Sequence, residues 1–412
     1  MLPNKKSKHI GIDARFYGPI GKGLGRYTKE VVDRLLEIDR ENNYVIFFRP
    51  ENYDEFKADS KRVKKVMVKI GWYGWAEQII FPFYIWRQHL DFIHFPHFNV
   101  PIFCPNKFVV TIHDLILLKF PTKRATTLGP FLYLVKNFFY KAVITLAVWR
   151  ASRVIAVSEF TKNDLIKQFK IKSEKVIVTY EGVTDLTYQP SLPLEKSQFG
   201  QSVTDKNLLL GYNIATPFLL YVGNAYPHKN LEGLVNVFKK IKKSLEIKSP
   251  TGDLISSPKN LQLVLVGKED YFYKRLKDYA KKFNLWQDNK VGSAVVFPGY
   301  VPDQQLKILY QQAAAYVFPS YYEGFGLPPL EAMANGCPVI SSNQTSLPEV
   351  LGNAALYFNP NDQKEMQNKI QSVISDKNLR QELINRGLEQ VKKYSWQECA
   401  KKTLLVYQQI FS

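Results

Sequence analysis

Residues 315–342 read AYVFPSYYEGFGLPPLEAMANGCPVISS, which joins a short apolar run, a glycine-rich turn, a helical segment and a second apolar run. The runs AYVFPS and PVISS are typical of buried strands. Pro328 and Pro329 suit the first turn of a helix, which we expect near 327–335. A strand, a helix and a further strand in this order predict a parallel β-α-β unit.

Two acidic residues, Glu323 and Glu331, flank the turn and are separated by seven residues, GFGLPPL. The glycines accept backbone angles that let the main chain approach a ligand closely. The N-terminus of the helix directs its amide groups at the end of the sheet, which makes a ready site for an anion. The carboxylates would then bind hydroxyl groups of the same ligand. The spacing alone fits a capped helix with two surface acids about equally well.

The residues before this stretch continue the alternation of strands and helices. We expect strands at 218–223, 261–267 and 294–300 and helices at 231–245 and 303–312. The segment SPTGDLISSPKN (249–260) is typical of an exposed loop. The second half of the chain is therefore predicted to form one doubly wound unit.

The first half repeats the pattern. Expected strands are HIGIDAR (9–15), YVIFF (44–48), VKKVMVKI (63–70), FIHF (92–95), FVVTIHD (108–114), RVIAVSE (153–159) and VIVTYEGV (176–183). A loop at 17–25 precedes a helix over 26–36, and Ser158 and Thr161 are expected to cap a later helix. Ligands of such sheets lie beyond the carboxyl ends of the strands, where Gly21 to Gly25 and His113 fall.

Domain boundaries follow from the linker and from the end of the chain. Residues 187–217 are rich in Pro, Ser, Gln and Lys and read as linker plus insertion, and 412 residues suit two or three domains. The last helix, near 396–411, has an apolar face that must cover a surface. We therefore expect one domain from 1–187 plus 396–412, and a second from 188–395.

Composition and charge limit the class of protein. The chain is 45% hydrophobic and 23% charged, which fits a globular protein. Three scattered cysteines fit neither a disulfide framework nor a zinc site, so a reducing compartment is expected. The N-terminus resembles no secretory signal, and the most apolar stretch, 128–149, is interrupted by two lysines. We expect a cytoplasmic protein.

The net charge of +19 is uneven. Residues 1–187 contain 30 Lys and Arg against 18 Asp and Glu, and 101–150 contain seven against one. Such a surface attracts nucleic acid, an acidic membrane face or phosphate-bearing substrates, or is merely solvated. We expect 128–149 to form either an internal helix or part of a peripheral contact with the inner face of a membrane. The aromatic stretch at 72–86 is expected to lie in the core.

Taken together, EGFGLPPLEAMANGCPVISSNQTSLPEV, YVGNAYPHKN, TIHDLI, IDARFYGPIGKGLGRYT, VIAVSEFTKNDL and FPGYVPDQQL resemble the motifs of family 4 glycosyltransferases. The resemblance covers nearly the whole chain in the expected order. It implies the α/β GT-B fold, with two Rossmann-like doubly wound parallel-sheet domains facing a central cleft. It also implies a retaining, metal-independent transfer from a nucleotide-diphosphate sugar. The sugar nucleotide is a substrate, so no cofactor is expected.

The resemblance also implies roles for particular residues. Glu323, His113 and Lys229 correspond to the catalytic set: the acid at the reacting carbon, the histidine beside the sugar and the cation on the diphosphate. Donor-binding positions are Gly23, His228, Gly299, Tyr300, Val301, Phe325, Gly326, Leu327 and Glu331, with Glu331 on the ribose. Where many members have an arginine, this chain has Asn224, so the diphosphate charge would rest mainly on Lys229, with His228 as a partial helper.

No metal site is expected. A metal on the diphosphate is usually held by an Asp-x-Asp pair, and the sequence has none. His94 and His97 form H-x-x-H, but no third ligand is obvious, so we read them as a strand end and its loop.

The function that these features favour is transfer of a sugar to a glycan or lipid-linked acceptor. The motifs most resemble mannosyltransferases of cell-surface polysaccharide synthesis, so GDP-mannose is the first expectation and a UDP-sugar the second. Alternatives are a nucleotide-sugar epimerase or phosphorylase on a similar fold, or a non-catalytic binder of anions or nucleic acid. A phosphorylase would need a pyridoxal-phosphate lysine, and no nucleic-acid module is recognisable.

Overall fold

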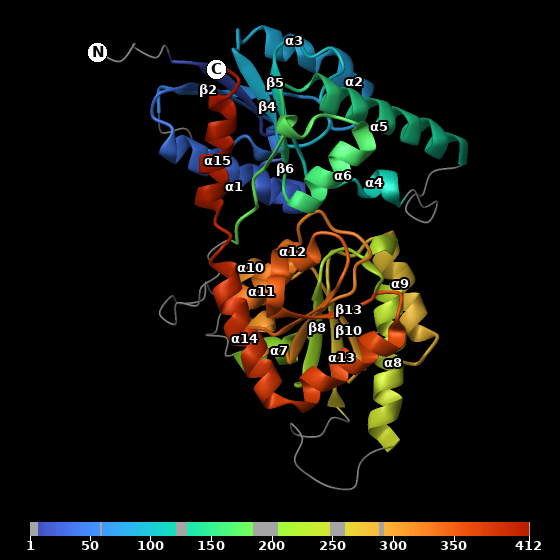
Figure 1. Ribbon diagram of the computed structural model, residues 1–412. Helices are drawn as coiled ribbons and strands as arrows, with labels where there is room; N and C mark the ends of the chain where they lie inside the picture. Colours follow the sequence, from blue (N-terminus) through green and yellow to red (C-terminus); the bar gives the residue numbers. More distant parts are fainter. Residues whose placement is uncertain are drawn as a thin grey trace. The chain divides into compact units, whose positions relative to one another are not determined.

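The computed structural model describes residues 7–57, 60–120, 130–183, 205–247, 260–287 and 292–411. They form two compact units (Figure 1). Unit 1 comprises Met1–Gly182 and Tyr394–Ser412, and unit 2 comprises Val183–Lys393. The chain therefore passes twice from one unit to the other. The expected boundaries lay a few residues further on, at 187 and 396.

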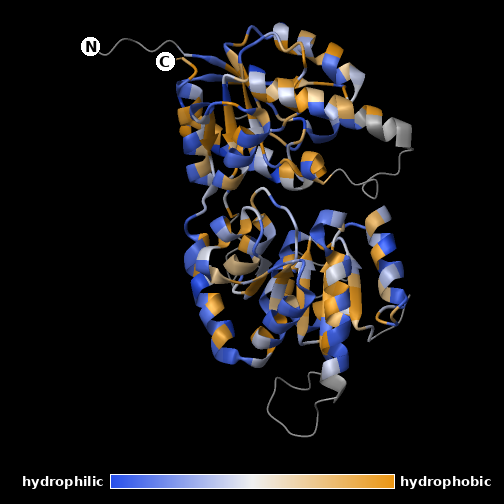
Figure 2. Ribbon diagram, turned by 45° about the vertical axis from the view of Figure 1, so that its right-hand side comes forward, coloured by the Kyte–Doolittle hydropathy of each residue, from blue (hydrophilic) through white to orange (hydrophobic). Residues whose placement is uncertain are grey.

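Unit 1 is built on a seven-stranded sheet in the order β3-β2-β1-β4-β5-β6-β7, and every neighbouring pair is parallel. The strands are β1 (His9–Asp13), β2 (Asn43–Phe48), β3 (Val63–Met67), β4 (Phe92–Phe95), β5 (Phe108–Ile112), β6 (Arg153–Ala156) and β7 (Val176–Val178). The strand order reverses beside β1, and ligands of such sheets bind at the carboxyl ends near that point. The central strands are coloured mostly hydrophobic in Figure 2, as expected for a sheet covered on both faces, whereas the edge strand β3 is partly exposed.

Helices cover both faces of this sheet. They are α1 (Lys22–Ile38), α2 (Trp75–Ile79), α3 (Phe81–Trp86), α4 (Ile116–Lys119), α5 (Pro130–Arg150), α6 (Glu159–Phe169) and α15 (Trp396–Gln408), with short 3-10 turns η1 (Pro19–Gly21), η2 (Pro50–Asn52) and η4 (Ser173–Lys175). The Ser158 hydroxyl accepts from the Thr161 amide at 3.0 Å, so the expected cap of α6 is confirmed.

The C-terminal helix α15 lies against α1 in unit 1 (Figure 1). Trp396 is 2% exposed, and the Tyr407 hydroxyl lies 2.7 Å from Nδ1 of His94 on β4. Where the chain leaves unit 1, a Cβ on Gly182 would lie 2.1 Å from the Trp396 amide nitrogen. Glycine is therefore required at this crossing, because the two chain segments touch through their main chains.

Unit 2 has a six-stranded parallel sheet in the order β10-β9-β8-β11-β12-β13. Its strands are β8 (Phe218–Val222), β9 (Gln262–Val266), β10 (Val295–Gly299), β11 (Ala315–Phe318), β12 (Val339–Ser342) and β13 (Ala355–Phe358). Its helices are α7 (Asp205–Gly211), α8 (Leu231–Ile247), α9 (Tyr271–Lys281), α10 (Asp303–Gln312), α11 (Leu327–Ala334), α12 (Leu347–Leu351), α13 (Gln363–Ser375) and α14 (Lys377–Val391), with turns η5 (Pro227–Lys229) and η7 (Gly352–Ala354). The predicted two-sheet α/β architecture is confirmed.

Three expectations about local structure need correction or fall outside the structure. Helix α1 begins at Lys22, four residues before the expected start. Part of the expected linker forms α7, while 184–204 and residues 249–259 of the expected loop over 249–260 lie outside the described residues. The aromatic stretch at 72–86 is not simply core, because it exposes one of its faces. Within the described residues, no helix is both long and apolar enough to span a bilayer.

Candidate active site

A buried ion pair lies at the carboxyl edge of the sheet of unit 2. The Lys229 ammonium donates to Oε1 of Glu323 at 2.6 Å, and the two side chains are only 13% and 10% exposed. Lys229 belongs to η5, which follows β8, and Glu323 follows β11, the strand beside it. Adjacent parallel strands thus bring together two groups that are 94 residues apart.

The turn that carries Glu323 is held by side chains from the segment before α12. The Glu323 amide donates to the Thr345 hydroxyl at 3.0 Å, and the Ser346 hydroxyl donates to the carbonyls of Glu323 and Phe325. Gly326 has φ of +107°, and a Cβ there would lie 2.9 Å from the Leu347 side chain. Both the backbone angle and the space therefore require glycine, which fixes the position of Glu323.

Helix α11 begins directly after this turn, at Leu327, with Pro328 and Pro329 in its first turn. Prolines carry no amide hydrogen, so among residues 327–329 only Leu327 can donate at the carboxyl edge, where the helix dipole also favours an anion. Glu331, in the second turn, is 7% exposed and accepts from the Tyr310 hydroxyl at 3.2 Å. Burial, followed by the charge of Glu331, raises the pKa of Tyr310 well above its ordinary value, so this hydroxyl remains a donor.

His228 precedes Lys229 and is buried. Burial, followed by the charge of Lys229, lowers the pKa of His228 to about 4. The lowered pKa makes the imidazole neutral near pH 7, and the expectation that His228 helps Lys229 with a diphosphate stays a prediction. The ring remains able to hydrogen-bond a phosphate or a sugar.

The segment Gly299 to Val301 lies at the same edge, at the end of β10. Gly299 has φ of +81° and open space where a Cβ would stand. Tyr300 is 69% exposed, whereas Val301 is buried. The positive φ turns the chain so that a large, accessible ring follows the strand, which suits stacking against a planar group.

In unit 1, His113 follows β5 at the carboxyl edge. Its Nδ1 lies 2.9 Å from Oε1 of Glu181, and its Nε2 lies 2.9 Å from the Pro96 carbonyl. Both partners accept, so both ring nitrogens donate and the ring is protonated. Burial would lower the pKa of His113, but the hydrogen bond and charge of Glu181 outweigh it and the pKa is raised.

The substitution Glu181→Gln tests this account. We expect the pKa of His113 to fall below its ordinary value near 6.5, because burial is then no longer offset. In the wild type, the stability from this pair is complete below the ordinary pKa and is lost as pH rises through the raised one. NMR titration of the His113 ring protons measures the change. An unaltered pKa in the variant would show that Glu181 is not the cause.

A buried network that was not predicted from sequence lies beside His113. Arg15 donates to Asp13 at 2.7 Å and to Glu77 at 2.6 Å, and the Asn99 amide donates to the same oxygen of Glu77 at 2.7 Å. All four residues are at most 4% exposed. The single acid in the apolar stretch at 72–86 was a usable signal, because a buried carboxylate needs a partner.

This network continues to His97, whose Nδ1 donates to Oδ1 of Asn99 at 2.7 Å. Burial, followed by the charge of His113, lowers the pKa of His97 to about 3, so this ring is neutral. His113 and His97 thus form a charged and a neutral imidazole with ring centroids 6.4 Å apart. His94 lies on β4 and His97 follows it, as the reading of a strand end and its loop predicts, and both nitrogens of His94 are taken by Tyr407 and Thr111.

Gly23 lies in the first turn of α1, and a Cβ there would touch nothing. By contrast, a Cβ on Gly25 would lie 2.0 Å from the Gly18 carbonyl oxygen. Packing therefore requires glycine at position 25. At position 23, the absence of a side chain leaves the main chain exposed to an approaching ligand.

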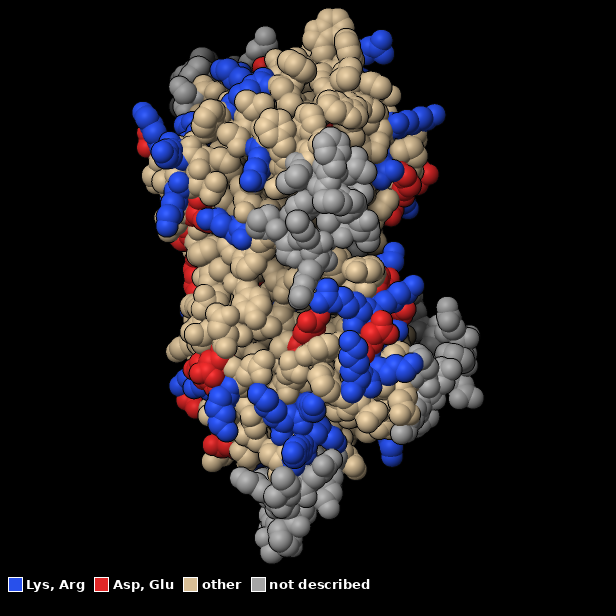
Figure 3. All heavy atoms as spheres, turned by 90° about the vertical axis from the view of Figure 1, so that its right-hand side faces the viewer, with Lys and Arg blue, Asp and Glu red and all other residues tan. Residues whose placement is uncertain are grey.

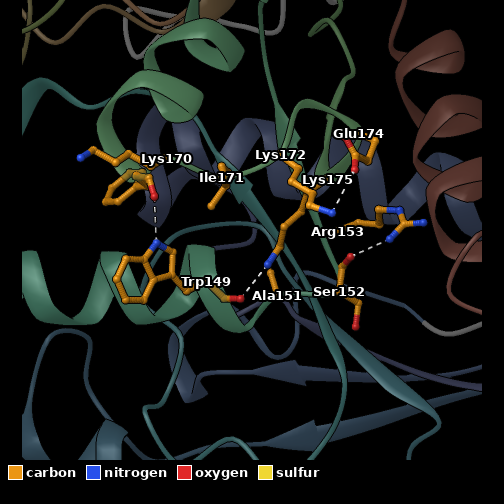
Figure 4. A pocket seen from close by; sticks show the side chains of 10 residues that line it. Trp149, Ala151, Ser152, Arg153, Lys170, Ile171, Lys172, Glu174 and Lys175 are labelled. Carbon is orange, nitrogen blue, oxygen red and sulfur yellow. Dashed lines mark hydrogen bonds and ion pairs between the residues drawn. The ribbon is translucent and has the colours of Figure 1, made fainter.

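A shallow cavity of about 540 Å³ in unit 1 holds none of the predicted site residues (Figure 4). Residues at the amino ends of β6 and β7 line this cavity, whereas His113 follows the carboxyl end of β5. The cavity and His113 therefore lie at opposite edges of the sheet. Two of its cations contact other groups of the protein: Lys175 donates to the Trp149 carbonyl at 2.6 Å, and Lys172 lies 3.9 Å from Glu174. The predicted residues of unit 2 do gather, at the carboxyl edge of its sheet.

Two protein-family models match the chain. Residues 21–185 match the model described as Glycosyltransferase Family 4, and residues 212–390 match the one described as Glycosyl transferases group 1. The two matches fall one in each half of the chain, and together they span most of it.

Relatives and solved structures agree with these matches. O-antigen chain mannosyltransferase B of Escherichia coli is 29% identical over 409 residues, 93% of this chain and 95% of that protein. O-antigen chain mannosyltransferase RfbU of Salmonella typhimurium is 31% identical over 274 residues, 65% of each. The sucrose-phosphate synthase structure from Thermosynechococcus elongatus has a TM-score of 0.72 at 20% identity, over 98% of this chain and 99% of that one. Anabaena HepE in complex with UDP and glucose has a TM-score of 0.67 at 16% identity, over 98% of this chain and 100% of that one.

Matching family models in both halves, relatives aligned over nearly the full length and the shared two-sheet architecture lead to one conclusion: the chain is a GT-B glycosyltransferase of the retaining family 4.

Proposed function

We propose that the protein transfers mannose from GDP-mannose to a glycan or lipid-linked acceptor, with retention of configuration. The observation that carries the proposal is the buried Lys229–Glu323 pair beside the N-terminus of α11. The choice of mannose rests on relatives named as O-antigen and serotype-specific mannosyltransferases. A UDP-sugar is the second candidate, since the HepE structure of the same fold holds UDP.

In this proposal unit 2 binds the donor. The leaving diphosphate gains negative charge as the glycosidic bond breaks, and Lys229, the Leu327 amide and the helix dipole of α11 stabilise it. Glu331 binds the ribose hydroxyls, and Glu323 binds the sugar near the reacting carbon. The stacking surface of Tyr300, with Gly299 and Val301, lies beside the base. Phe325, Gly326 and Leu327 supply main-chain contacts to the phosphate and sugar.

Unit 1 takes the acceptor in this proposal, and Gly23 and His113 contribute from its carboxyl edge. His113 carries a proton on both ring nitrogens and donates them to Glu181 and to the Pro96 carbonyl, so it contributes a positive charge and does not act as a base. Attack from the face that the diphosphate leaves, with a phosphate oxygen taking the acceptor proton, accounts for retention without a protein nucleophile. The acceptor is presented at the inner face of a membrane.

A panel of nucleotide sugars tests the donor by thermal shift. A ligand that binds the folded state raises the unfolding midpoint by mass action. We expect GDP-mannose to give the largest rise, above GDP-glucose, UDP-glucose and UDP-N-acetylglucosamine. A larger rise with a UDP-sugar would identify that UDP-sugar, and not GDP-mannose, as the donor. No rise with any of these nucleotide sugars would contradict the proposed function.

We expect transfer to be unaffected by chelation. Lys229 and the helix N-terminus supply the positive potential that a divalent cation supplies in other transferases. Initial rates with and without EDTA measure this, and a matched reaction with added Mg²⁺ or Mn²⁺ is the control. Loss of activity in EDTA with rescue by either ion would show that a metal is needed.

A further inference from the structure

Four large apolar side chains project into solvent from α2 and α3. Trp75 is 67% exposed, Ile79 59%, Phe83 61% and Trp86 62%. Their spacing of four, four and three residues places them on one side of a nearly continuous helix. The helix is interrupted at Ile80, two residues before Pro82, which has no amide to donate to the preceding turn. We call this row the apolar stripe.

The opposite side of the same helices is also apolar. Phe81 and Ile85 are fully buried in the core of unit 1, and Glu77 is held inside by Arg15 and Asn99. The buried side of the two helices therefore already supplies their packing against the core. The apolar stripe has no packing role toward the sheet, and exposing it costs free energy unless something covers it.

The stripe continues onto α5. The rings of Trp75 and Phe139 meet edge to face, with centroids 5.0 Å apart, and Phe138 beside it is 68% exposed. The loop at Ile102 is bonded to α2, because the side-chain oxygen of Gln78 accepts from the Ile102 amide at 2.8 Å. The next residue of this loop, Phe103, is 74% exposed. Three segments thus contribute to one apolar surface.

The exposed charged residues on α2, α3 and α5 are positive. No acid occurs between residues 130 and 150, and the single acid between 70 and 90, Glu77, is buried. Arg87 at the end of α3 and Lys141 on α5 are exposed. Figure 3 faces this side of unit 1 and shows an area with few charged side chains, bordered mainly by Lys and Arg with some Asp and Glu at its left and right edges.

We propose that the apolar stripe, with Phe138 and Phe139, is the surface by which unit 1 inserts into the headgroup region of an anionic lipid bilayer. Tryptophan and phenylalanine beside Lys and Arg, with no exposed acid on α2, α3 or α5, suit the boundary between acyl chains and anionic headgroups. A second copy of the chain fits this surface less well, because pairing would set positive charge against positive charge.

Docking here has a geometric consequence for the acceptor. Glu77 lies between the stripe residues Trp75 and Ile79, and its carboxylate joins Asn99, which in turn holds His97 beside His113. A membrane on the stripe is therefore rigidly connected to the carboxyl edge of the sheet. The use of this connection for a lipid-linked acceptor rests on the proposed function, whereas docking itself does not.

Sedimentation with vesicles tests the surface. Full-length protein is mixed with vesicles of phosphatidylcholine alone or with an equal share of phosphatidylglycerol, at low and high salt. We expect binding only to the anionic vesicles, declining as salt screens the charges. The double variant Phe83→Asn with Trp86→Gln should partition at least about tenfold less, because its apolar insertion is lost.

Matched controls separate this surface from others. Leu210→Asn on α7 and Leu405→Asn on α15 remove equally exposed apolar side chains, at 62% and 56%, and should bind as the wild type. Arg87→Gln with Lys141→Gln should lower the gain from anionic lipid. Tryptophan emission should shift to shorter wavelength in the wild type with anionic vesicles, and less so in the Trp86 variant.

Each other outcome overturns the proposal. The proposal is wrong if the wild-type protein stays in the supernatant. It is also wrong if the Phe83 and Trp86 variant binds the vesicles as well as the wild type does. A dimer in sedimentation velocity that this variant dissociates, without vesicle binding, assigns the stripe to a second copy. Donor binding measured on the same samples keeps the questions apart: its absence in a vesicle-binding wild type would count against the transferase proposal alone.

Discussion

Replacing Glu323 by Gln is expected to leave the fold intact and to lower kcat on the order of 100-fold or more. Glutamine has the same shape and keeps an oxygen for the Lys229 ammonium, which now lies 2.6 Å from Oε1. The Thr345 and Ser346 bonds to the Glu323 main chain are untouched. What is lost is the negative charge, which matters most when positive charge develops at the reacting carbon.

The measurement is kcat on the purified variant at saturating donor, with the thermal midpoint as the check on folding. Glu382→Gln, on the exposed side of α14, is the matched control and should behave as the wild type. Near-normal turnover in the Glu323 variant would remove this residue from the chemistry.

Replacing Lys229 by Ala is expected to weaken binding of a nucleoside diphosphate by about ten- to 100-fold, since a hydrogen bond to a charged group contributes about 1.5–3 kcal/mol. Binding of the free nucleoside should hardly change, because it has no phosphate to contact. Calorimetry with GDP and guanosine, or UDP and uridine, measures both. Lys364→Ala on the exposed start of α13 is the control, and equal losses for nucleotide and nucleoside would refute the assignment.

The ion pair complicates this experiment in a way that the structure makes predictable. Removing Lys229 leaves Glu323 buried without its partner, and uncompensated charges in such positions cost about 3–5 kcal/mol of stability. The double variant Lys229→Ala with Glu323→Gln removes both charges and should recover much of this stability. If it does, the loss of diphosphate affinity in the double variant reports on the ligand contact alone.

The sequence was most informative where local pattern decides structure. Apolar runs of a few residues predicted the strands that flank the turn at Glu323, and the two prolines predicted the start of α11. The start of α1 was missed because Gly23 and Gly25 read as loop, whereas Gly25 is glycine for packing against the Gly18 carbonyl within a helix. Propensity cannot separate these two reasons for a glycine.

Partners that are distant in sequence could not be predicted in the same way. Glu181 lies 68 residues after His113, and nothing local indicates that its charge decides the protonation of that ring. It does follow a strand, however, and the rule that placed His113 at a carboxyl end would have placed Glu181 there too. The aromatic stretch at 72–86 was assigned to the core as a whole because composition does not tell which side of a helix faces the sheet. The structure divides it residue by residue.

The close contact of Gly182 with Trp396 bears on how the molecule is made. Unit 1 is discontinuous, and its last helix α15 is encoded after the whole of unit 2. During synthesis the seven strands of unit 1 leave the ribosome long before the helix that covers α1, so Tyr27 and the Gly182 main chain lack the ring and backbone of Trp396 until the end. In a nascent chain of this protein, unit 1 therefore lacks its last helix while unit 2 is completed. Translation itself sets the order in which the two units reach their final form.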